Sequence, residues 1–459
     1  MEGILGSPPE APTRARDDVE RTVERTAVRA VGLLLAFLWL VNARLLWLPA
    51  GADRLDPNLR VVVQPADGVS LVLVGLWWLA AGPRALRLHW RSGLLALITA
   101  GLAVVVLAAL AVHPSPRGVE MVLRLAAAAA TADLIRRVST TAWTRILAVV
   151  VAAGSVQALL GLAQSARGGT VGISAVEYSG PLYRFGSSFA GRGSFGHPYH
   201  LASLLVVACG AAAVGAWRSP RRWPWPWLAG LALSAAALAT TYSRAGALGL
   251  LALLGVLLVA AARARDRAPA LAALALVLGF AVGGLAFGDG WVARSSQTTN
   301  ASALDSGRRV RAAEAIRLTR RHRLLGVGPG RYVIALQQTG VRDALPAHNL
   351  PLQAAAEAGV LAGVLAAAAL GGLALRAWRG GVQALALFLP LAPFTVLDAY
   401  PYVFPTGIAL SGVWLGLVLH HRSSVGRDGR SARVEEHAVA GGSSAPTAPG
   451  DRRPATVTG

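Results

Sequence analysis

Long apolar runs recur along almost the whole chain, and they restrict its fold more than any other feature of the sequence. A helix that crosses a lipid bilayer needs roughly 20 predominantly apolar residues, within a range of about 17–25. Runs of this kind occupy residues 30–48, 66–82, 92–112, 118–135, 142–163, 197–217, 226–242, 245–262, 268–288, 350–375, 382–398 and 406–420. We therefore predict an all-α, polytopic integral membrane protein of about 12 transmembrane helices.

Two parts of this pattern are unusual. Within the run 118–135, three charged residues, Glu120, Arg124 and Asp133, interrupt the apolar sequence. Between the runs 226–242 and 245–262, the separation is so short that the two must form a hairpin or one broken helix.

The composition agrees with a membrane protein. Of the 459 residues, 54% are apolar and only 15% are charged, against roughly 25% charged in ordinary soluble domains. All 44 basic residues are arginine and the net charge is +21, which by itself is compatible with nucleic acid as a partner. Most arginines lie between the apolar runs, however, so we expect the lipid bilayer as a partner and no nucleic acid. The single cysteine, Cys209, excludes an intramolecular disulfide.

The arginines also predict the orientation of the chain, because basic loops stay in the cytoplasm. With the N-terminus inside, the inner segments up to residue 379 hold 19 arginines, and the shorter outer loops hold seven. We therefore expect a multi-pass protein of the cytoplasmic membrane with both termini inside. Its parts are a cytoplasmic segment 1–29, a membrane domain 30–420 and a disordered cytoplasmic tail 421–459.

Two predicted outer loops are long, one at about 164–196 and the other at about 289–349. The second carries ten arginines, against the general trend. Within it, residues 307–323 have a helix-forming composition with apolar Val310, Ala313 and Ile316 on one side. This pattern is typical of a basic helix that lies in the membrane interface.

Two clusters of polar residues lie at the outer ends of predicted spans. The first is the segment 191–198, Gly-Arg-Gly-Ser-Phe-Gly-His-Pro, in which Arg192 is suited to an anion; the simpler interpretation is a flexible loop that turns into a helix at Pro198. The second is Tyr242-Ser243-Arg244 in the tight hairpin. Although an arginine here is most often an interfacial anchor, the short turn holds Arg244 near the membrane surface.

Two further clusters belong to the long loop and the span after it. One comprises Ser306-Gly307-Arg308-Arg309 and the glycine-rich segment 322–330, which we interpret as a turn that ends the basic helix. The other begins with His348-Asn349. Asn349 suits a helix N-cap, and with Gln353 and Glu357 it shares one helix face. The Glu357 carboxylate lies inside a predicted span, where a charge is costly and tends to mark function. We expect Gln353 to lie at the solvated edge of a cavity.

Taken in order, these four clusters resemble the O-antigen ligase and polymerase superfamily over roughly residues 185–375. The first five predicted spans add nothing to the resemblance. The sequence departs from the family pattern at three positions: Tyr199 stands where asparagine is frequent, Ala312 where tryptophan is frequent, and Arg323 where proline is usual.

The resemblance implies inverting transfer of a glycan from a polyprenyl diphosphate carrier to an acceptor hydroxyl, at the outer face of the cytoplasmic membrane, with neither metal nor other cofactor. Arg244 and Arg308 are then the expected ligands of the diphosphate, because guanidinium groups bind phosphate oxygens in a two-pronged way. Arg192 is a possible third ligand. His348 is the expected base, and Asn349 and Glu357 are the expected substrate-binding residues.

The sequence leaves several alternatives open. The same residues serve a ligase, which places a finished glycan on a glycan, lipid or protein, or a polymerase, which joins repeat units; the compact His348-Asn349 pair favours the ligase. A small-anion transporter is a reading from another class, but transporters tend to contain repeated halves and we find no repeat. A purely structural membrane protein leaves the outer arginines unexplained.

Overall fold

The computed structural model describes residues 11–37, 46–48, 61–81, 93–174, 177, 183–219, 223–263, 267–296, 301–341 and 344–420. The predicted tail 421–459 and the first ten residues of the predicted segment 1–29 lie outside this part of the chain. The described part is helical except for its loops and two short antiparallel strand pairs, β1 (Leu46–Leu48) with β2 (Val61–Val63) and β3 (Arg184–Phe185) with β4 (Ser188–Phe189). The predicted all-α, polytopic class is confirmed.

The first half of the chain forms five long helices: α1 (Ala11–Phe37), α2 (Pro65–Ala81), α3 (Gly93–Val112), α4 (Pro116–Arg137) and α5 (Thr140–Arg167). The charged residues of α4 are satisfied within the protein. Arg124 donates two hydrogen bonds to Asp67 of α2, at 2.8 and 2.7 Å, and also pairs with Glu120. Asp133 accepts a hydrogen bond from Trp77 at 3.0 Å. Pairing of this kind is what allows charged side chains inside an apolar helix bundle.

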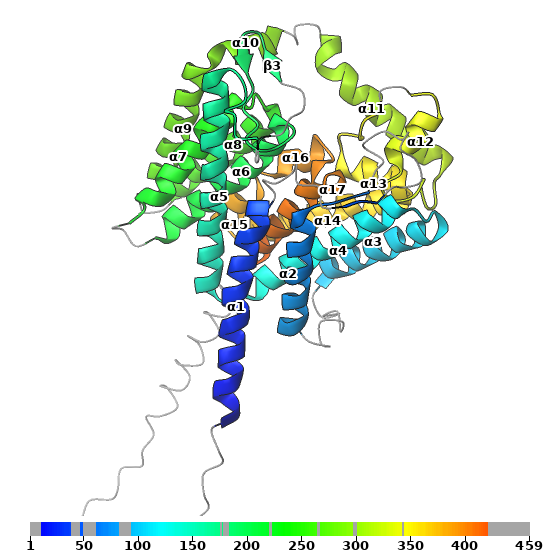
Figure 1. Ribbon diagram of the computed structural model, residues 1–459, viewed down its shortest axis with the longest axis horizontal. Coiled ribbons are helices and arrows are strands. Elements are labelled where there is room, and N and C mark those ends of the chain that lie inside the picture. The colour runs from blue at the N-terminus through cyan, green and yellow to red at the C-terminus, as the bar shows by residue number, and fades with distance from the viewer. Residues whose placement is uncertain are drawn as a thin grey trace, which may run out of the picture.

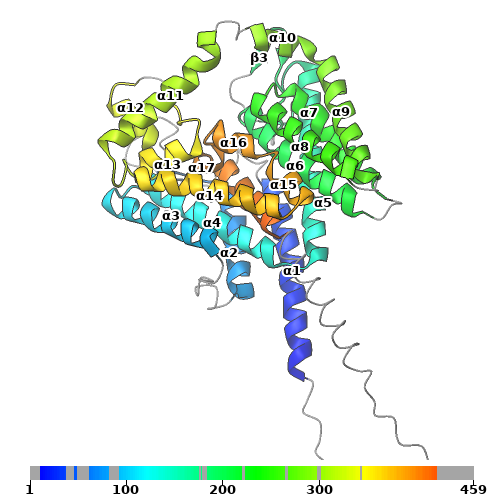
Figure 2. The same cartoon turned by 180° about the vertical axis from the view of Figure 1, so that it is seen from behind.

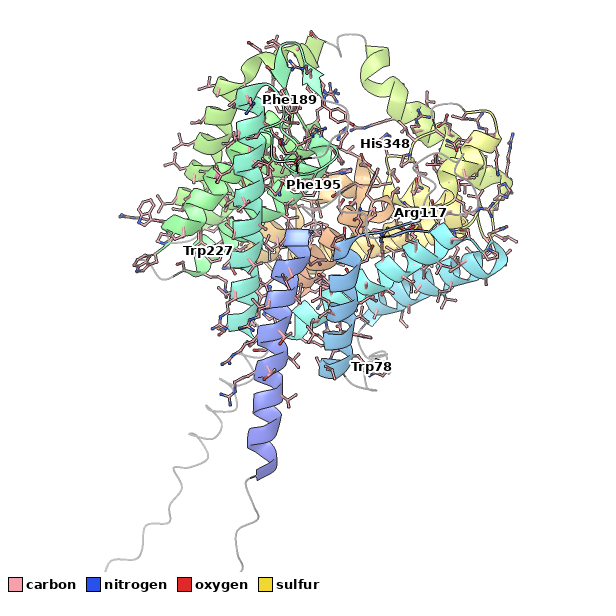
Figure 3. All side chains as sticks on the ribbon, in the orientation of Figure 1. Trp78, Arg117, Phe189, Phe195, Trp227 and His348 are labelled. Atoms are coloured by element: carbon pink, nitrogen blue, oxygen red, sulfur yellow. The ribbon has the colours of Figure 1, made fainter. Side chains whose placement is uncertain are left out.

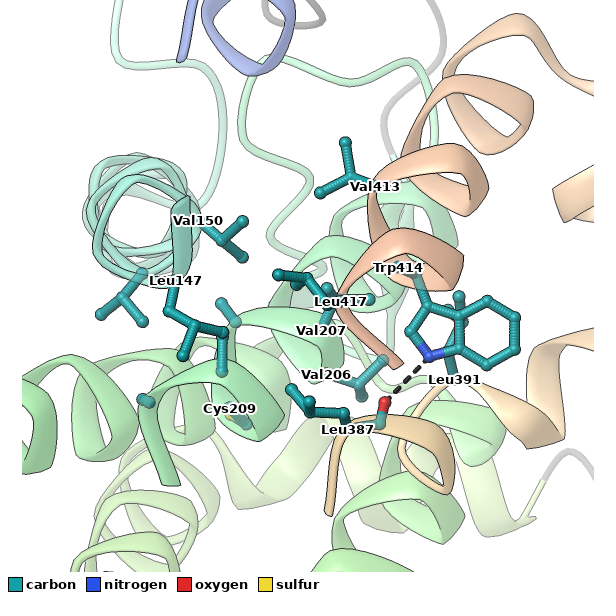
Figure 4. Close-up of a cluster of buried hydrophobic side chains, with 14 of the residues drawn as sticks. Leu147, Val150, Val206, Val207, Cys209, Leu387, Leu391, Val413, Trp414 and Leu417 are labelled. Carbon is teal, nitrogen blue, oxygen red and sulfur yellow. Dashed lines mark hydrogen bonds between the residues drawn. The ribbon is translucent and has the colours of Figure 1, made fainter. Parts of the chain in front are cut away.

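The middle of the chain forms a bundle of four apolar helices: α6 (Pro198–Arg218), α7 (Trp225–Thr240), α8 (Arg244–Arg263) and α9 (Ala268–Ala286). The core lies where α5 and α6 meet the C-terminal segments (Figure 4). There Leu147 of α5 and Val206 of α6 belong to one buried cluster with Leu387, whose carbonyl accepts a 2.8 Å hydrogen bond from the Trp414 indole. Because most of its residues are buried, α6 is the central helix of the bundle.

The last part of the chain is broken into shorter pieces: α10 (Gly288–Ser296), α11 (Ala301–Arg321), α12 (Tyr332–Gln338), α13 (Leu350–Ala358), α14 (Val360–Arg379), α15 (Val382–Phe388), α16 (Ala392–Val396), α17 (Tyr400–Val403) and the helix Pro405–His420. The predicted continuous span 350–375 therefore differs from the structure. The helix stops at Gly359, where φ is +92°, and α14 starts a new direction. The predicted span 382–398 is likewise divided between α15 and α16.

Within the described residues, six helices are long and apolar enough to cross a membrane: α3, α5, α6, α8, α9 and α14. Three shorter apolar helices, Pro65–Ala80, Trp225–Thr240 and Pro405–His420, match predicted spans in position. The predicted number of about 12 spans is not confirmed. Figures 1 and 2 show α10, β3 and α11 at one end of the molecule, whereas the N-terminal half of α1 extends from the opposite end.

The orientation in the membrane stays a prediction, which cysteine labelling tests. We expect Ala313→Cys on α11 to react with an impermeant thiol reagent in intact cells, and Ser443→Cys in the tail to react only after permeabilisation. The native thiol does not interfere, because Cys209 is fully buried. Labelling of the tail in intact cells would reverse the orientation.

Candidate active site

His348 (Figure 3) lies beside an aspartate that the sequence did not single out. Its Nδ1 is 3.2 Å from Oδ2 of Asp398, and its backbone has a φ of +50°, which is rare for a residue with a side chain. The other oxygen of Asp398 accepts hydrogen bonds from the backbone N–H groups of Ala399 and Tyr400, at 2.7 and 3.1 Å. A carboxylate fixed in this way orients the imidazole and leaves Nε2 for a substrate. The sequence contained one signal for Asp398, namely an acidic residue at the end of the predicted span 382–398.

Asn349 holds this pair together. Its side-chain oxygen caps α13 by accepting from the Leu352 N–H at 3.0 Å, and its amide nitrogen donates to the Val396 carbonyl at 3.0 Å. The same side chain therefore joins the start of α13, which follows His348, to the end of α16, which precedes Asp398. The predicted N-cap is confirmed, while substrate binding by Asn349 stays a prediction.

Gln353 and Glu357 lie inside the protein rather than at a wet edge. They are 1% and 2% exposed. Gln353 accepts from the Ala347 N–H and donates to Glu357, both at 2.9 Å. Our expectation of a solvated Gln353 is therefore wrong, because its amide completes a buried chain of hydrogen bonds that fixes the backbone just before His348. Glu357 remains a predicted substrate ligand, but its contacts are those of a positioning residue.

The glycine-rich segment 322–330 wraps around the end of α13. The Glu357 carboxylate accepts from the Gly330 N–H at 3.0 Å, and the Glu357 carbonyl accepts from the Gly328 N–H at 2.9 Å. At Gly326 (φ +62°), an added Cβ would lie 2.2 Å from the backbone of Glu357, so only glycine permits this approach. The turns predicted after the basic helix are confirmed, and they connect the third polar cluster to the fourth.

Gly359 provides a test of this packing. Its φ is +92°, and an added Cβ would lie 1.9 Å from the Leu324 carbonyl oxygen. We expect Gly359→Ala to lower the thermal unfolding temperature, because both strain and a clash arise. Gly340→Ala is the matched control: its φ is +89°, but no atom lies within 4 Å of the added Cβ, so only strain of about 1–3 kcal/mol remains. Equal losses in the two variants would contradict the importance of the Leu324 contact.

Three arginines from different elements come together at the α10 end of the molecule. Arg244 begins α8 directly after the turn at Tyr242, Arg294 lies in the last turn of α10, and Arg308 is exposed on α11. Burial lowers the pKa of Arg294, and the positive charges of Arg244 and Arg308 lower it further. Among the described side chains, no carboxylate forms an ion pair with Arg244 or Arg308.

Arg294, Arg308 and Asp398 all act electrostatically on residues at the start of α6. Burial lowers the pKa of His197 to about 4; the Asp398 charge opposes this shift, and the Arg294 charge adds to it. Tyr199, in the first turn of α6, interacts electrostatically with both Asp398 and Arg308. His197 and Asp398 thus connect groups that are far apart in the sequence.

Arg192 differs from the other predicted arginines. Its side chain is fully buried, and its backbone N–H donates to the Gln164 side chain of α5 at 3.1 Å. The Gln164 amide also donates to the Gly193 carbonyl at 2.7 Å, and Gln157 accepts from the Ser194 N–H at 3.0 Å. These bonds fix the loop before α6 against α5. Substrate binding by Arg192 stays a prediction. Because the side chain is buried, its first role is to stabilise this loop.

The basic helix predicted at 307–323 is present as α11, which ends at Arg321, and the side that packs on the protein is not its predicted apolar side. Glu314, Ala315 and Leu318 are buried, whereas Val310 and Ile316 are 50% and 40% exposed. The reason is the small side chain of Ala315, which lets α11 pack closely against the cluster around α12 and α13. The side with Val310 and Ile316 is thereby left free for the membrane interface.

The fold and these residues define a polytopic α-helical membrane protein with an arginine-rich site beside a histidine–aspartate pair. Residues 229–367, from α7 into α14, match the sequence model of the O-antigen ligase family. This match confirms the resemblance to the O-antigen ligase and polymerase superfamily. The matched segment contains Arg244, Arg308 and His348, while Arg192 and Asp398 lie outside it. No curated protein matches the chain.

Proposed function

We propose that this protein is a ligase-type glycosyltransferase that moves a glycan from a polyprenyl diphosphate carrier to an acceptor hydroxyl at the outer face of the cytoplasmic membrane. One observation carries the proposal: Arg308 and Asp398, which is the partner of His348, both act electrostatically on Tyr199, and Arg308 and Arg244 both act on Arg294. Cations for a phosphate-based leaving group and a base for a hydroxyl are the two groups that this reaction needs.

The arginines serve the leaving group. When the bond between the anomeric carbon and the diphosphate breaks, its electron pair goes to the phosphate oxygen, and negative charge increases there. Arg244 and Arg308 stabilise this charge because guanidinium groups stay protonated and bind two phosphate oxygens at once. Stabilisation of developing charge by fixed cations is commonly the largest contribution to catalysis. No metal or other cofactor enters this proposal.

His348 serves the acceptor. Asp398 holds Nδ1 of the imidazole, so Nε2 accepts the proton of the acceptor hydroxyl as its oxygen forms the new bond to the anomeric carbon. The acceptor oxygen enters as the diphosphate leaves, so the configuration at that carbon inverts. The acceptor belongs to a glycan, a lipid or a protein. We favour the ligase over the polymerase because His348 and Asn349 are adjacent and act as one compact unit.

Transfer in a defined system tests the proposal. Purified protein in liposomes is supplied with a labelled glycan on undecaprenyl diphosphate and with an acceptor, and we expect labelled acceptor together with released undecaprenyl diphosphate. If the carrier is released but the acceptor is not labelled, the acceptor supplied is the wrong one. The experiment is then repeated with unlabelled donor in place of the acceptor, because a polymerase uses a second donor molecule as its acceptor. Solute uptake driven by an ion gradient, with no transfer, would overturn the proposal in favour of a transporter.

A further inference from the structure

We propose that Arg294 is a third cationic ligand of the donor diphosphate, in the position that the sequence suggested for Arg192. The inference rests on the proposed function and adds to it a binding residue that none of the four sequence clusters contains. Arg294 follows the predicted span 268–288 by only a few residues, in a loop with ten arginines, so nothing in the sequence distinguished it from its neighbours.

An aromatic ring fixes the direction of the Arg294 side chain. Its guanidinium carbon lies 4.6 Å from the centre of the Phe185 ring, a cation–π contact that orients a planar group. Phe185 belongs to the β3–β4 hairpin, and its ring in turn contacts Tyr242 edge-on at 5.3 Å. Arg294 is therefore held to the turn that carries Arg244.

Tyr242 attaches the whole of α10 to that turn. Its hydroxyl donates to the Phe287 carbonyl at 3.1 Å, and its ring lies edge-on to Trp291 at 5.7 Å. Gly290 packs so closely on the ring that an added Cβ would lie 2.1 Å from it. The Trp291 indole donates to the Ala239 carbonyl at the end of α7, at 2.8 Å. Arg244 and Arg294 consequently occupy fixed positions relative to one another.

The charges around Arg294 indicate what it binds. The positive charges of Arg244 and Arg308 act on it directly, and like charges held this close repel one another. An anion placed between the guanidinium groups relieves this repulsion. A carrier diphosphate has two phosphate groups and gains charge as the glycan leaves, so it offers oxygens to all three arginines. Arg192 lacks this access because it is fully buried.

Binding of inorganic pyrophosphate to the purified full-length protein, measured by calorimetry in detergent, tests this inference. A lost hydrogen bond to a charged group corresponds to roughly 10- to 100-fold in affinity, and we expect this loss for Arg294→Gln. The affinity of Arg294→Lys should lie between those of the wild type and Arg294→Gln, because lysine keeps the positive charge but cannot bind two phosphate oxygens at once. Arg320→Gln, an exposed arginine of α11 without a place in the cluster, is the control and should bind like the wild type.

The outcomes separate the two proposals. Wild-type affinity in Arg294→Gln, with an unchanged thermal unfolding temperature, would overturn the role of Arg294. If Arg294→Gln unfolds, Phe185→Leu takes its place: it keeps the guanidinium but removes the ring that orients it, and it should weaken pyrophosphate binding. Binding that depends on Arg294, in a protein that transfers no glycan to any acceptor, would refute the proposed function and leave the diphosphate site standing.

Discussion

His348→Ala is expected to slow glycan transfer by about 10²–10⁴-fold, the usual contribution of a general base, while the polyprenyl diphosphate donor still binds. The separation follows from the proposed roles, because the imidazole acts on the acceptor hydroxyl and the arginines hold the donor. The measurement is transfer of a labelled glycan in liposomes, with donor binding determined separately. Near-normal transfer by His348→Ala would remove the base assignment, and Glu357 or a bound water would be the next candidate.

Two further variants sharpen this test. Asp398→Asn keeps the size of the side chain but removes the charge that faces Nδ1 at 3.2 Å, so we expect a large loss of transfer here too. His322→Ala replaces another histidine of the same loop region that is exposed and lies outside the hydrogen-bonded network around Glu357, and it should retain activity. Gln353→Ala is not a mild control, because Gln353 is buried and positions the backbone before His348.

Arg308→Lys is expected to reduce transfer clearly, by roughly 10- to 100-fold, although the positive charge is kept. A lysine ammonium is a point charge and cannot reproduce the two-pronged contact of a guanidinium with a phosphate group. The loss should appear mainly in the transfer rate, because Arg308 acts on charge that develops as the diphosphate leaves. Single-turnover rates at saturating donor measure it.

Neighbouring arginines supply the comparison. Arg309→Lys alters the next residue of α11, which is also exposed, and should be nearly neutral. Arg244→Ala should weaken donor binding and transfer together, since the start of α8 holds it in place in the ground state. If Arg308→Lys and Arg309→Lys behave alike, Arg308 contributes only general positive charge at the membrane surface and is not a diphosphate ligand.

The sequence by itself determined the class of protein and most of its membrane helices. Runs of apolar residues have no soluble alternative at this composition, and so α3, α5, α6, α8 and α9 lie where the hydropathy placed them. The sequence also singled out Arg244 and His348, because polar residues at the ends of apolar helices are few, and Arg308 through the resemblance to the O-antigen ligase and polymerase superfamily. Local chemistry was similarly readable at Asn349, which caps α13 as predicted.

The tertiary structure alone decided how these residues are combined. Hydropathy does not show that the helix is interrupted at Gly359, because apolar alanine and leucine residues continue on both sides. Hydropathy also does not reveal that Asp398, 50 residues after His348 in the sequence, lies in contact with the His348 side chain. The roles of Arg192 and Arg294 depend on packing: one side chain is enclosed by the protein, and the other is held against Phe185 beside Arg244. Charge and polarity are properties of a residue, whereas burial and proximity are properties of the folded chain.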